Sequence, residues 1–295
     1  MRVTQGMLAS NSLRNLSNSY TKMGKYQDQL ATGKKITKPS DDPVVAMKGM
    51  FYRSNLSEVE QYKRNLSESY LWMENSEDGV NHVNEALSRV RELVVQGTNG
   101  TLSDTDKEAV GREIEQIKKD IMTVANTQIN GRYIYNGTNT SQAPVTLGED
   151  GKIKVTMNTS DYLVEVSRGV SLKANINPDN VFGQKIFETL QSIEDNLTST
   201  EFVATDLNSL LGDLDKQMDT LSAERSELGA RYNRLEMIES RILSQEVIAT
   251  RVLSDNEDAD LERVIVDLTT QESIHRAALS VGSRIIQPTL MDFLR

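Results

Sequence analysis

The sequence predicts a mainly α protein: an elongated, antiparallel helical bundle of the coiled-coil type that carries a small β-rich insertion. Two tracts, residues 44–143 and 179–287, contain no proline and therefore permit long helices. Apolar residues in most of the chain recur at alternating spacings of three and four, which is the narrow seam of a coiled coil. Aromatic residues make up only 5% of the chain, so a large globular core is not expected.

The first expected helix lies within residues 1–38. Its seam begins at Ala9 and continues with the same spacing to Leu30. The residues between the seam positions are rich in serine and asparagine, which form helices poorly. A helix of this kind is marginal alone and is expected to form against a partner.

Three capping patterns place the next boundaries. Residues 40–43, Ser-Asp-Asp-Pro, indicate a helix start, because a capping side chain and acidic residues precede a proline in the first turn. Asn99-Gly100 is a turn signal that ends this second helix. Residues 103–106, Ser-Asp-Thr-Asp, resemble a capping box and open a third helix.

Residues 131–182 change character and predict the β-rich insertion. Asn130-Gly131 and Asn136-Gly137 mark tight turns at its start. Short β-rich runs follow at residues 152–157, 162–166 and 170–174. Helical periodicity returns near Phe182.

The longest seam runs from Leu207 to Leu253, and a last amphipathic segment follows from Leu261. Each long helix has one apolar stripe to bury, so the outgoing and returning helices are expected to pack side by side. We therefore predict a central rod from residues 41–130 and 183–254. Its predicted seam residues are Leu56, Val59, Leu87, Val90, Ile114, Ile117, Ile121, Leu214, Leu221, Leu228, Leu235 and Ile242.

The two chain ends carry opposite charge. Residues 1–38 hold seven basic residues and one acidic residue, whereas residues 254–295 hold eight acidic residues and four arginines. We expect residues 1–40 and 255–295 to be loose in the monomer and to pair as a coiled coil on assembly. The predicted assembly residues are Leu13, Leu16, Tyr20, Met23, Leu30, Leu261, Val264, Leu268, Leu279 and Ile286. The basic N-terminus leaves nucleic acid, an anionic membrane or an organellar transit peptide open as alternatives.

Several classes of chemistry are not expected. The chain has no cysteine and only two histidines, which excludes disulfide scaffolds, thiolate zinc sites and histidine-rich metal sites. Asp104, Asp106, Glu108 and Glu115 match the acidic positions of a calcium loop, but an alanine replaces its turn glycine, so a helix start is the better interpretation. No phosphate-binding loop or catalytic triad pattern is present. We expect no catalytic residue, no metal and no cofactor, and hence no enzyme.

Neither a membrane span nor a secretory signal is expected from the sequence. No apolar run approaches the roughly 20 residues that a span needs. The first residues also lack the apolar region of a secretory signal. His82 and His275 both lie beside apolar positions and are interpreted as packed interface residues.

Three segments resemble the bacterial flagellin and hook-associated protein family: residues 30–43, residues 86–96 and the ending at residues 288–295. Within the family, residues 38–43 and 131–138 are more similar to the hook-associated branch than to flagellin. The positions that carry the N-terminal motifs are Pro39, Ser40, Asp41, Asp42, Pro43, Arg89, Arg91 and Glu92.

The resemblance implies a structural subunit of the extracellular flagellum that is exported unfolded through the flagellar type III apparatus. It would form a ring, with copies of itself, at the junction between hook and filament. Its implied partners are hook-associated protein 1, flagellin and an export chaperone at the C-terminal region, with no nucleic acid and no membrane insertion. A minor flagellin is one alternative, and a coiled-coil binding module with a basic N-terminus is another.

Overall fold

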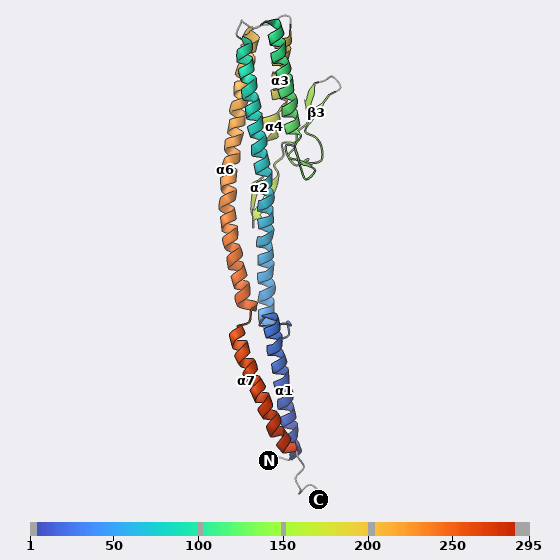
Figure 1. The fold of residues 1–295 in the computed structure, drawn as a ribbon, viewed down its shortest axis with the longest axis vertical. Coiled ribbons are helices and arrows are strands. Elements are labelled where there is room, and N and C mark those ends of the chain that lie inside the picture. The colour runs from blue at the N-terminus through green and yellow to red at the C-terminus, as the bar shows by residue number, and fades with distance from the viewer. Residues whose placement is uncertain (1–4, 99–102, 149–151, 200–203, 287–295) are drawn as a thin grey trace, which may run out of the picture. The chain divides into compact units, whose positions relative to one another are not determined.

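A computed structural model describes residues 5–98, 103–148, 152–199 and 204–286. Its elements in chain order are helices α1 (Gln5–Thr32), α2 (Pro43–Thr98) and α3 (Asp104–Ala125), strands β1 (Gln128–Ile129), β2 (Arg132–Tyr133), β3 (Val145–Leu147), β4 (Ile153–Val155), β5 (Leu163–Ser167) and β6 (Val170–Lys173), and helices α4 (Pro178–Phe182), α5 (Gln184–Thr198), α6 (Ala204–Glu257) and α7 (Leu261–Ile286) (Figure 1). The predicted class, a helical bundle with a small β-rich insertion, is confirmed.

The helix starts follow from the caps that the sequence provides. Pro43 is the first residue of α2, and the Asp42 side chain accepts hydrogen bonds from the backbone N–H groups of Val44 and Val45 at 3.0 and 3.1 Å. At α3, Ser103 and Asp106 form both hydrogen bonds of a capping box. This arrangement confirms a helix start where the acidic spacing resembled a calcium loop.

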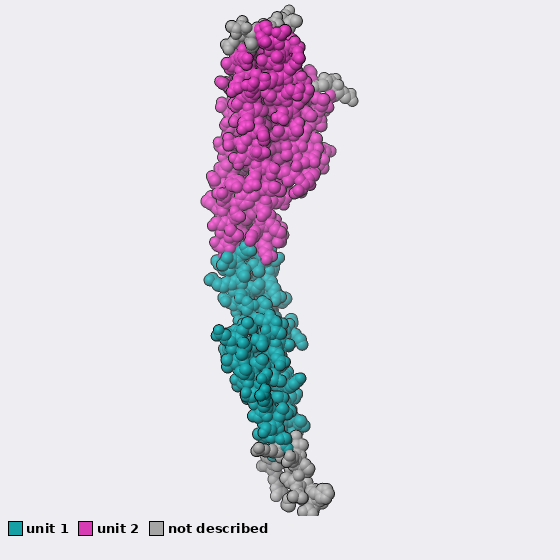
Figure 2. Space-filling view, in the orientation of Figure 1, with its two compact units in different colours: residues 1–58, 245–295 teal, residues 59–244 magenta. Residues whose placement is uncertain are grey.

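The chain divides into two compact units (Figure 2). Unit 1 comprises residues 1–58 and 245–295, and unit 2 comprises residues 59–244. The first turns of α2 and the last turns of α6 therefore belong with the terminal helices, whereas we predicted divisions at residues 40 and 255.

Within unit 1, α1 and α7 lie side by side and run antiparallel (Figure 1). Gln271 on α7 donates a 2.7 Å hydrogen bond to Ser19 on α1, and the loops at the other end of the two helices are joined by an antiparallel bridge between Lys34 and Asp258. The two chain ends thus pair within a single chain.

The hydrophobic core lies in unit 2, where α2, α3, α5, α6 and the insertion meet. Ten of the twelve predicted seam residues are buried there: Val59, Leu87, Val90, Ile114, Ile121, Leu214, Leu221, Leu228, Leu235 and Ile242. Ile117 is half-buried against this core, and Leu56 is half-buried in unit 1.

The insertion consists of three two-stranded antiparallel hairpins, β1–β2, β3–β4 and β5–β6. It begins at Gln128, slightly before the predicted boundary, and ends where α4 starts at Pro178. Two strands cannot form an independent core. Each hairpin therefore depends on the neighbouring helices, as the buried side chains of Val145, Val164 and Leu172 show.

Tyr135 anchors the insertion on α2. Its hydroxyl donates a 2.9 Å hydrogen bond to the backbone oxygen of Asn75, and its ring packs against Phe182 in a tilted arrangement with centroids 4.6 Å apart. Burial raises the pKa of Tyr135 well above the ordinary value of tyrosine. The ring fits because residue 79 of α2 is glycine, and a Cβ at this position would overlap the Tyr135 hydroxyl.

A buried carboxylate ties the end of the insertion to α6. Glu224 accepts hydrogen bonds from the backbone N–H of Asn177 and the side-chain amide of Asn180, both at 2.8 Å. Arg231, two helical turns further on, lies 3.5 Å from Glu224 and donates to the backbone oxygen of Asn175 at 2.7 Å. The carboxylate is paired and hydrogen-bonded, which is the condition for burying a charge without a large penalty.

We expect Gly79→Ala to destabilise unit 2, because the added methyl group displaces the anchored Tyr135 ring. Overpacking of this kind costs about 1–3 kcal/mol of unfolding free energy. Gly229→Ala on α6 is the matched control, since a Cβ there meets nothing within 4 Å. It should be neutral or stabilising by up to about 1 kcal/mol. Urea unfolding of the two variants makes the comparison, and equal midpoints would contradict the role of Gly79.

Candidate assembly surface

Unit 1 leaves most of its large apolar side chains in solvent. Among the described residues of unit 1, only Ala249 and Val264 are buried apolar residues. Its exposed large apolar residues are Met7, Leu8, Leu13, Tyr20, Leu30, Val44, Met47, Met50, Phe51, Val247, Ile248, Leu261, Ile265, Val266, Ile274, Leu279 and Val281. An exposed apolar surface of this extent marks a region where proteins interact.

The predicted assembly residues fall into two groups. Leu16, Met23 and Leu268 are half-buried, and Val264 is buried. The exposed members are Leu13, Tyr20, Leu30, Leu261 and Leu279. Ile286 is the last residue of α7, and its side chain lies outside the described residues. The exposed residues are therefore available for contact with other molecules.

The seam between α1 and α7 is small and partly polar. Ser19 is buried beneath Gln271, and the rings of Tyr20 and His275 lie 6.1 Å apart. His275 is half-buried, as expected for a packed histidine, and its Nδ1 atom has no hydrogen-bond partner among the described residues. His82 differs from the expectation, because its side chain is 59% exposed on α2 near Asp78. Position 82 lies outside the apolar stripe of α2, and its side chain faces solvent.

Four charged residues join the loop after α1 to the break between α6 and α7; we call Lys34, Arg53, Glu257 and Asp258 the clasp. Lys34 Nζ lies 2.7 Å from Asp258 Oδ1 and 3.7 Å from Glu257 Oε2. Arg53 Nη2 lies 2.8 Å from the same Glu257 oxygen. Glu257 is only 5% exposed, so this carboxylate depends on its two cationic partners.

Backbone hydrogen bonds reinforce the clasp. Lys35 N–H donates to the Glu257 oxygen at 2.7 Å, and Ala259 N–H donates to the Gly33 oxygen at 2.8 Å. Gly33 has a φ of +68°, a left-handed conformation that ends α1 and turns the chain toward α7. Gly49 lets the Glu257 side chain lie against α2, because a Cβ there would come within 2.5 Å of Glu257 Oε1.

The clasp shifts two pKa values in opposite directions. The hydrogen bond from Lys34 lowers the pKa of Asp258, and a second bond from Ser254 adds to the effect. The same bond to Asp258 raises the pKa of Lys34. Both groups are therefore charged over the whole neutral range.

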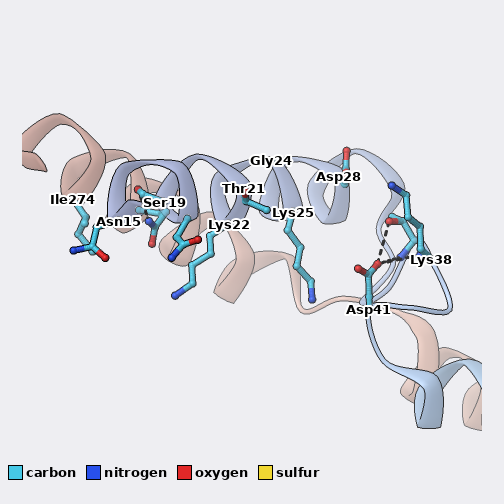
Figure 3. Close-up of a pocket in the computed structure, with 13 residues that line it drawn as sticks. Asn15, Ser19, Thr21, Lys22, Gly24, Lys25, Asp28, Lys38, Asp41 and Ile274 are labelled. Atoms are coloured by element: carbon cyan, nitrogen blue, oxygen red, sulfur yellow. Dashed lines mark hydrogen bonds between the residues drawn. The ribbon is translucent and has the colours of Figure 1, made fainter. Parts of the chain in front are cut away.

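Cationic side chains line an open cleft of about 780 Å³ formed by α1, the loop before α2 and α7. Lys22 and Lys25 extend from the same side of α1 in Figure 3, and Lys38 lies beside Asp41 at one end. The ammonium groups of these three lysines make no ion pair with any described residue. We expected the basic N-terminus to pair with the acidic C-terminus, but the intrachain ion pairs of its described lysines are confined to Lys34.

The residues of the N-terminal motifs have structural roles in each unit. The Asp41 carboxylate accepts from the backbone N–H groups of Lys38 and Thr37, which lowers the pKa of Asp41 and closes the turn around Pro39 and Ser40. In unit 2, Arg89 bonds to Glu113 on α3 and to Glu92 on its own helix, and Arg91 bonds to Asp215 on α6, at 2.8–3.1 Å. These residues were chosen because they match the N-terminal motifs, and their contacts in the structure stabilise the helices and the turn.

No group of three or more histidine or acidic residues that could hold a metal ion exists among the described residues. The acidic run at residues 255–260 spans the end of α6 and the break before α7, where Asp260 Oδ1 accepts from the backbone N–H of Arg263. None of the described helices is long and apolar enough to cross a membrane.

The fold and this surface define a class: helical subunits whose two chain ends pair in a core-poor unit. Two family models agree, the bacterial flagellin N-terminal helical region over residues 3–140 and the bacterial flagellin C-terminal helical region over residues 211–294. Together the two matches cover well over half of the chain. The chain belongs to the bacterial flagellin family.

Individual relatives refine this picture. The chain is 26% identical to flagellar hook-associated protein 3 of Escherichia coli (strain K12) over 300 residues, covering 94% of this chain and 95% of the relative. It is 23% identical to flagellin of Bacillus subtilis (strain 168) over 296 residues, with 94% of both chains covered. The crystal structure of the flagellar junction protein FlgL from Legionella pneumophila superposes with a TM-score of 0.60 at 16% identity, covering 72% of this chain and 100% of that chain.

We expect Glu257→Ala to loosen α1 and α7, because Lys34 and Arg53 then lose their buried partner. Because both cations keep access to solvent, the cost is that of lost charge-assisted hydrogen bonds, about 1–3 kcal/mol. The measurement is amide hydrogen exchange of the monomer, in which protection of both terminal helices should fall while that of unit 2 is unchanged. Glu262→Ala, an exposed carboxylate of α7 outside the clasp, is the matched control and should leave the pattern unaltered.

The pair of Lys34 and Asp258 should make stability depend on pH at both extremes. The pKa of Asp258 is lowered, so its contribution is complete above the ordinary aspartate pKa of about 4 and is lost as pH falls through the folded value. The pKa of Lys34 is raised, so its contribution is complete below about 10.4 and is lost at higher pH.

Thermal melts of the wild type and of Asp258→Asn at several pH values test this dependence. The difference in melting temperature should be present at neutral pH and shrink below about pH 4. A difference that is equally large in strong acid would contradict the assigned pair.

Proposed function

We propose that this protein is a structural subunit of the bacterial flagellum that forms the junction ring between hook and filament, on which flagellin assembles. The observation that carries the proposal is the exposed apolar surface of unit 1 in a chain of the flagellin family. At similar coverage the chain is 26% identical to flagellar hook-associated protein 3 of Escherichia coli and 23% identical to flagellin of Bacillus subtilis, which supports this member of the family over others.

The two units divide the work in this proposal. Unit 2 has a buried core and folds as a self-contained rod with its insertion. Unit 1 orders two helices of 28 and 26 residues with very little burial. Fixing a residue costs about 1–2 kcal/mol of conformational entropy, whereas a fully buried valine returns only about 1.5–3 kcal/mol. Pairing of α1 and α7 is therefore marginal in the monomer and becomes stable when neighbouring chains cover the remaining apolar surface.

The partners follow from this role. Neighbouring copies of the chain would form the ring. Hook-associated protein 1 would lie on one side of this ring and flagellin on the other. An export chaperone would cover the C-terminal region, because exposed apolar residues of α7 such as Ile265 and Val266 need protection before assembly. The site of action is the extracellular flagellum, and the role is structural, without catalysis.

A second candidate is a minor flagellin that forms part of the filament itself. The matching family models, which are those of flagellin, favour it. The two candidates differ in what happens when the protein is absent. Loss of a junction subunit leaves hooks without filaments and flagellin in the medium, whereas loss of a minor flagellin leaves filaments in place.

Electron microscopy of a deletion strain, with flagellin measured in the culture medium, is the deciding experiment. We expect bare hooks and shed flagellin. Attached filaments in the deletion strain would refute the junction role, and long filaments formed by the purified protein alone would favour the flagellin alternative.

Complementation with variants then tests the division between the units. Leu13→Asp and Tyr20→Asp place a charge on the exposed apolar surface of α1. These variants should be exported and folded as monomers but should fail to restore filaments. Leu228→Asp buries an unpaired charge in unit 2 and should lower monomer helicity and melting temperature, at a cost of several kcal/mol. Equal loss of helicity in all three variants would contradict the proposed division.

A further inference from the structure

Two Asn-Gly pairs of the insertion lie in opposite surroundings. Asn130 and Gly131 form the two-residue loop of the β1–β2 hairpin, since Ile129 pairs with Arg132 across it. Asn130 is exposed and has a φ of +52°, and Gly131 has a φ of +77°. The Asn130 side chain makes no hydrogen bond with any described residue, and a Cβ at Gly131 would meet nothing within 4 Å.

Asn136 is also followed by glycine, but its side chain is buried. It is 1% exposed, its Nδ2 donates to the Gln142 oxygen at 3.0 Å, and its Oδ1 accepts from the Asn158 N–H at 2.7 Å. Gly137 is packed against the backbone of Asn158 and Ser160. Both polar atoms of this side chain are therefore held, and water has no access to it.

The chemistry of an Asn-Gly pair gives these environments different outcomes. The backbone nitrogen of the glycine can attack the asparagine Cγ, which forms a five-membered succinimide and expels the side-chain nitrogen as ammonia. Glycine permits this attack because it has no Cβ to obstruct it. Water then opens the ring to aspartate or isoaspartate. The net reaction consumes one water and releases one ammonia, and nothing is oxidised or reduced.

We propose that Asn130 is a site of spontaneous deamidation in the folded protein and that Asn136 is protected by its surroundings. Rotation of the Asn130 side chain toward the Gly131 nitrogen breaks no hydrogen bond. At Asn136 the same rotation breaks two, and it requires a local opening of the insertion. The difference arises from the fold, because the two dipeptides are identical in sequence.

Isoaspartate at position 130 would change the hairpin. It adds one backbone methylene to a loop whose two-residue length sets the register of Gln128 with Tyr133 and of Ile129 with Arg132. Arg132 also bonds to Glu68 on α2 at 3.2 Å, and this contact depends on the same register. Deamidation therefore loosens the attachment of the first hairpin to α2.

The sequence separates the two pairs for measurement. Trypsin cleaves after Lys119, Arg132 and Lys152, so Asn130 lies in peptide 120–132 and Asn136 lies in peptide 133–152 of the same digest. The full-length protein is aged at mildly alkaline pH, both folded and in concentrated urea, and each peptide is followed by fragment mass spectrometry with isoaspartate detection. Asn130→Gln is the matched control, because glutamine does not form the five-membered ring readily.

In the folded protein we expect conversion in peptide 120–132 to exceed that in peptide 133–152 about tenfold or more, because Asn136 reacts only through local opening. In urea the two peptides should convert at similar rates, and the glutamine variant should lose the signal of peptide 120–132. Equal conversion in the folded protein would overturn the proposal. It would also be overturned if neither peptide converts in the folded state while both convert in urea, since the hairpin would then protect Asn130.

Discussion

Each long helix of this chain carries one narrow apolar stripe, and the two units meet that constraint differently. In unit 2, α2 and α6 bury their stripes against α3, α5 and the insertion, so Leu87, Leu214 and Leu228 are almost fully removed from solvent. In unit 1, α1 and α7 have only each other, and two helices cannot enclose a core. The apolar residues that remain outside form an exposed surface of the kind that marks a region of interaction.

Unit 1 is held together mainly by polar contacts, because it has no large hydrophobic core. The clasp fixes the loop after α1 to the break between α6 and α7 through one buried carboxylate, Glu257, and its two cations. Such a pair adds little net stability but is costly to break on one side, so it determines which geometry the segment adopts. The arrangement is thus specified in geometry but only weakly stabilised.

The insertion is attached by a few particular contacts rather than by its own core. Tyr135 packs into the space left by Gly79, and Glu224 binds the segment before α4. These contacts explain why a glycine stands in the middle of a long helix, where it would otherwise be unfavourable. They also leave loops such as Asn130-Gly131 in solvent, where their chemistry differs from that of the enclosed Asn136.

The sequence alone indicated most of the long helices, their caps and the presence of the insertion, because spacing, proline and capping residues act over a few neighbouring positions. It also indicated the family through local motifs. Only the tertiary structure decided which side of each terminal helix is covered: Leu13 and Tyr20 share a stripe with Leu16 and Met23 yet remain exposed. It likewise decided that Lys34 pairs with Asp258 while Lys22 and Lys25 form no ion pair with the described residues, since opposite charge alone does not specify which residues meet.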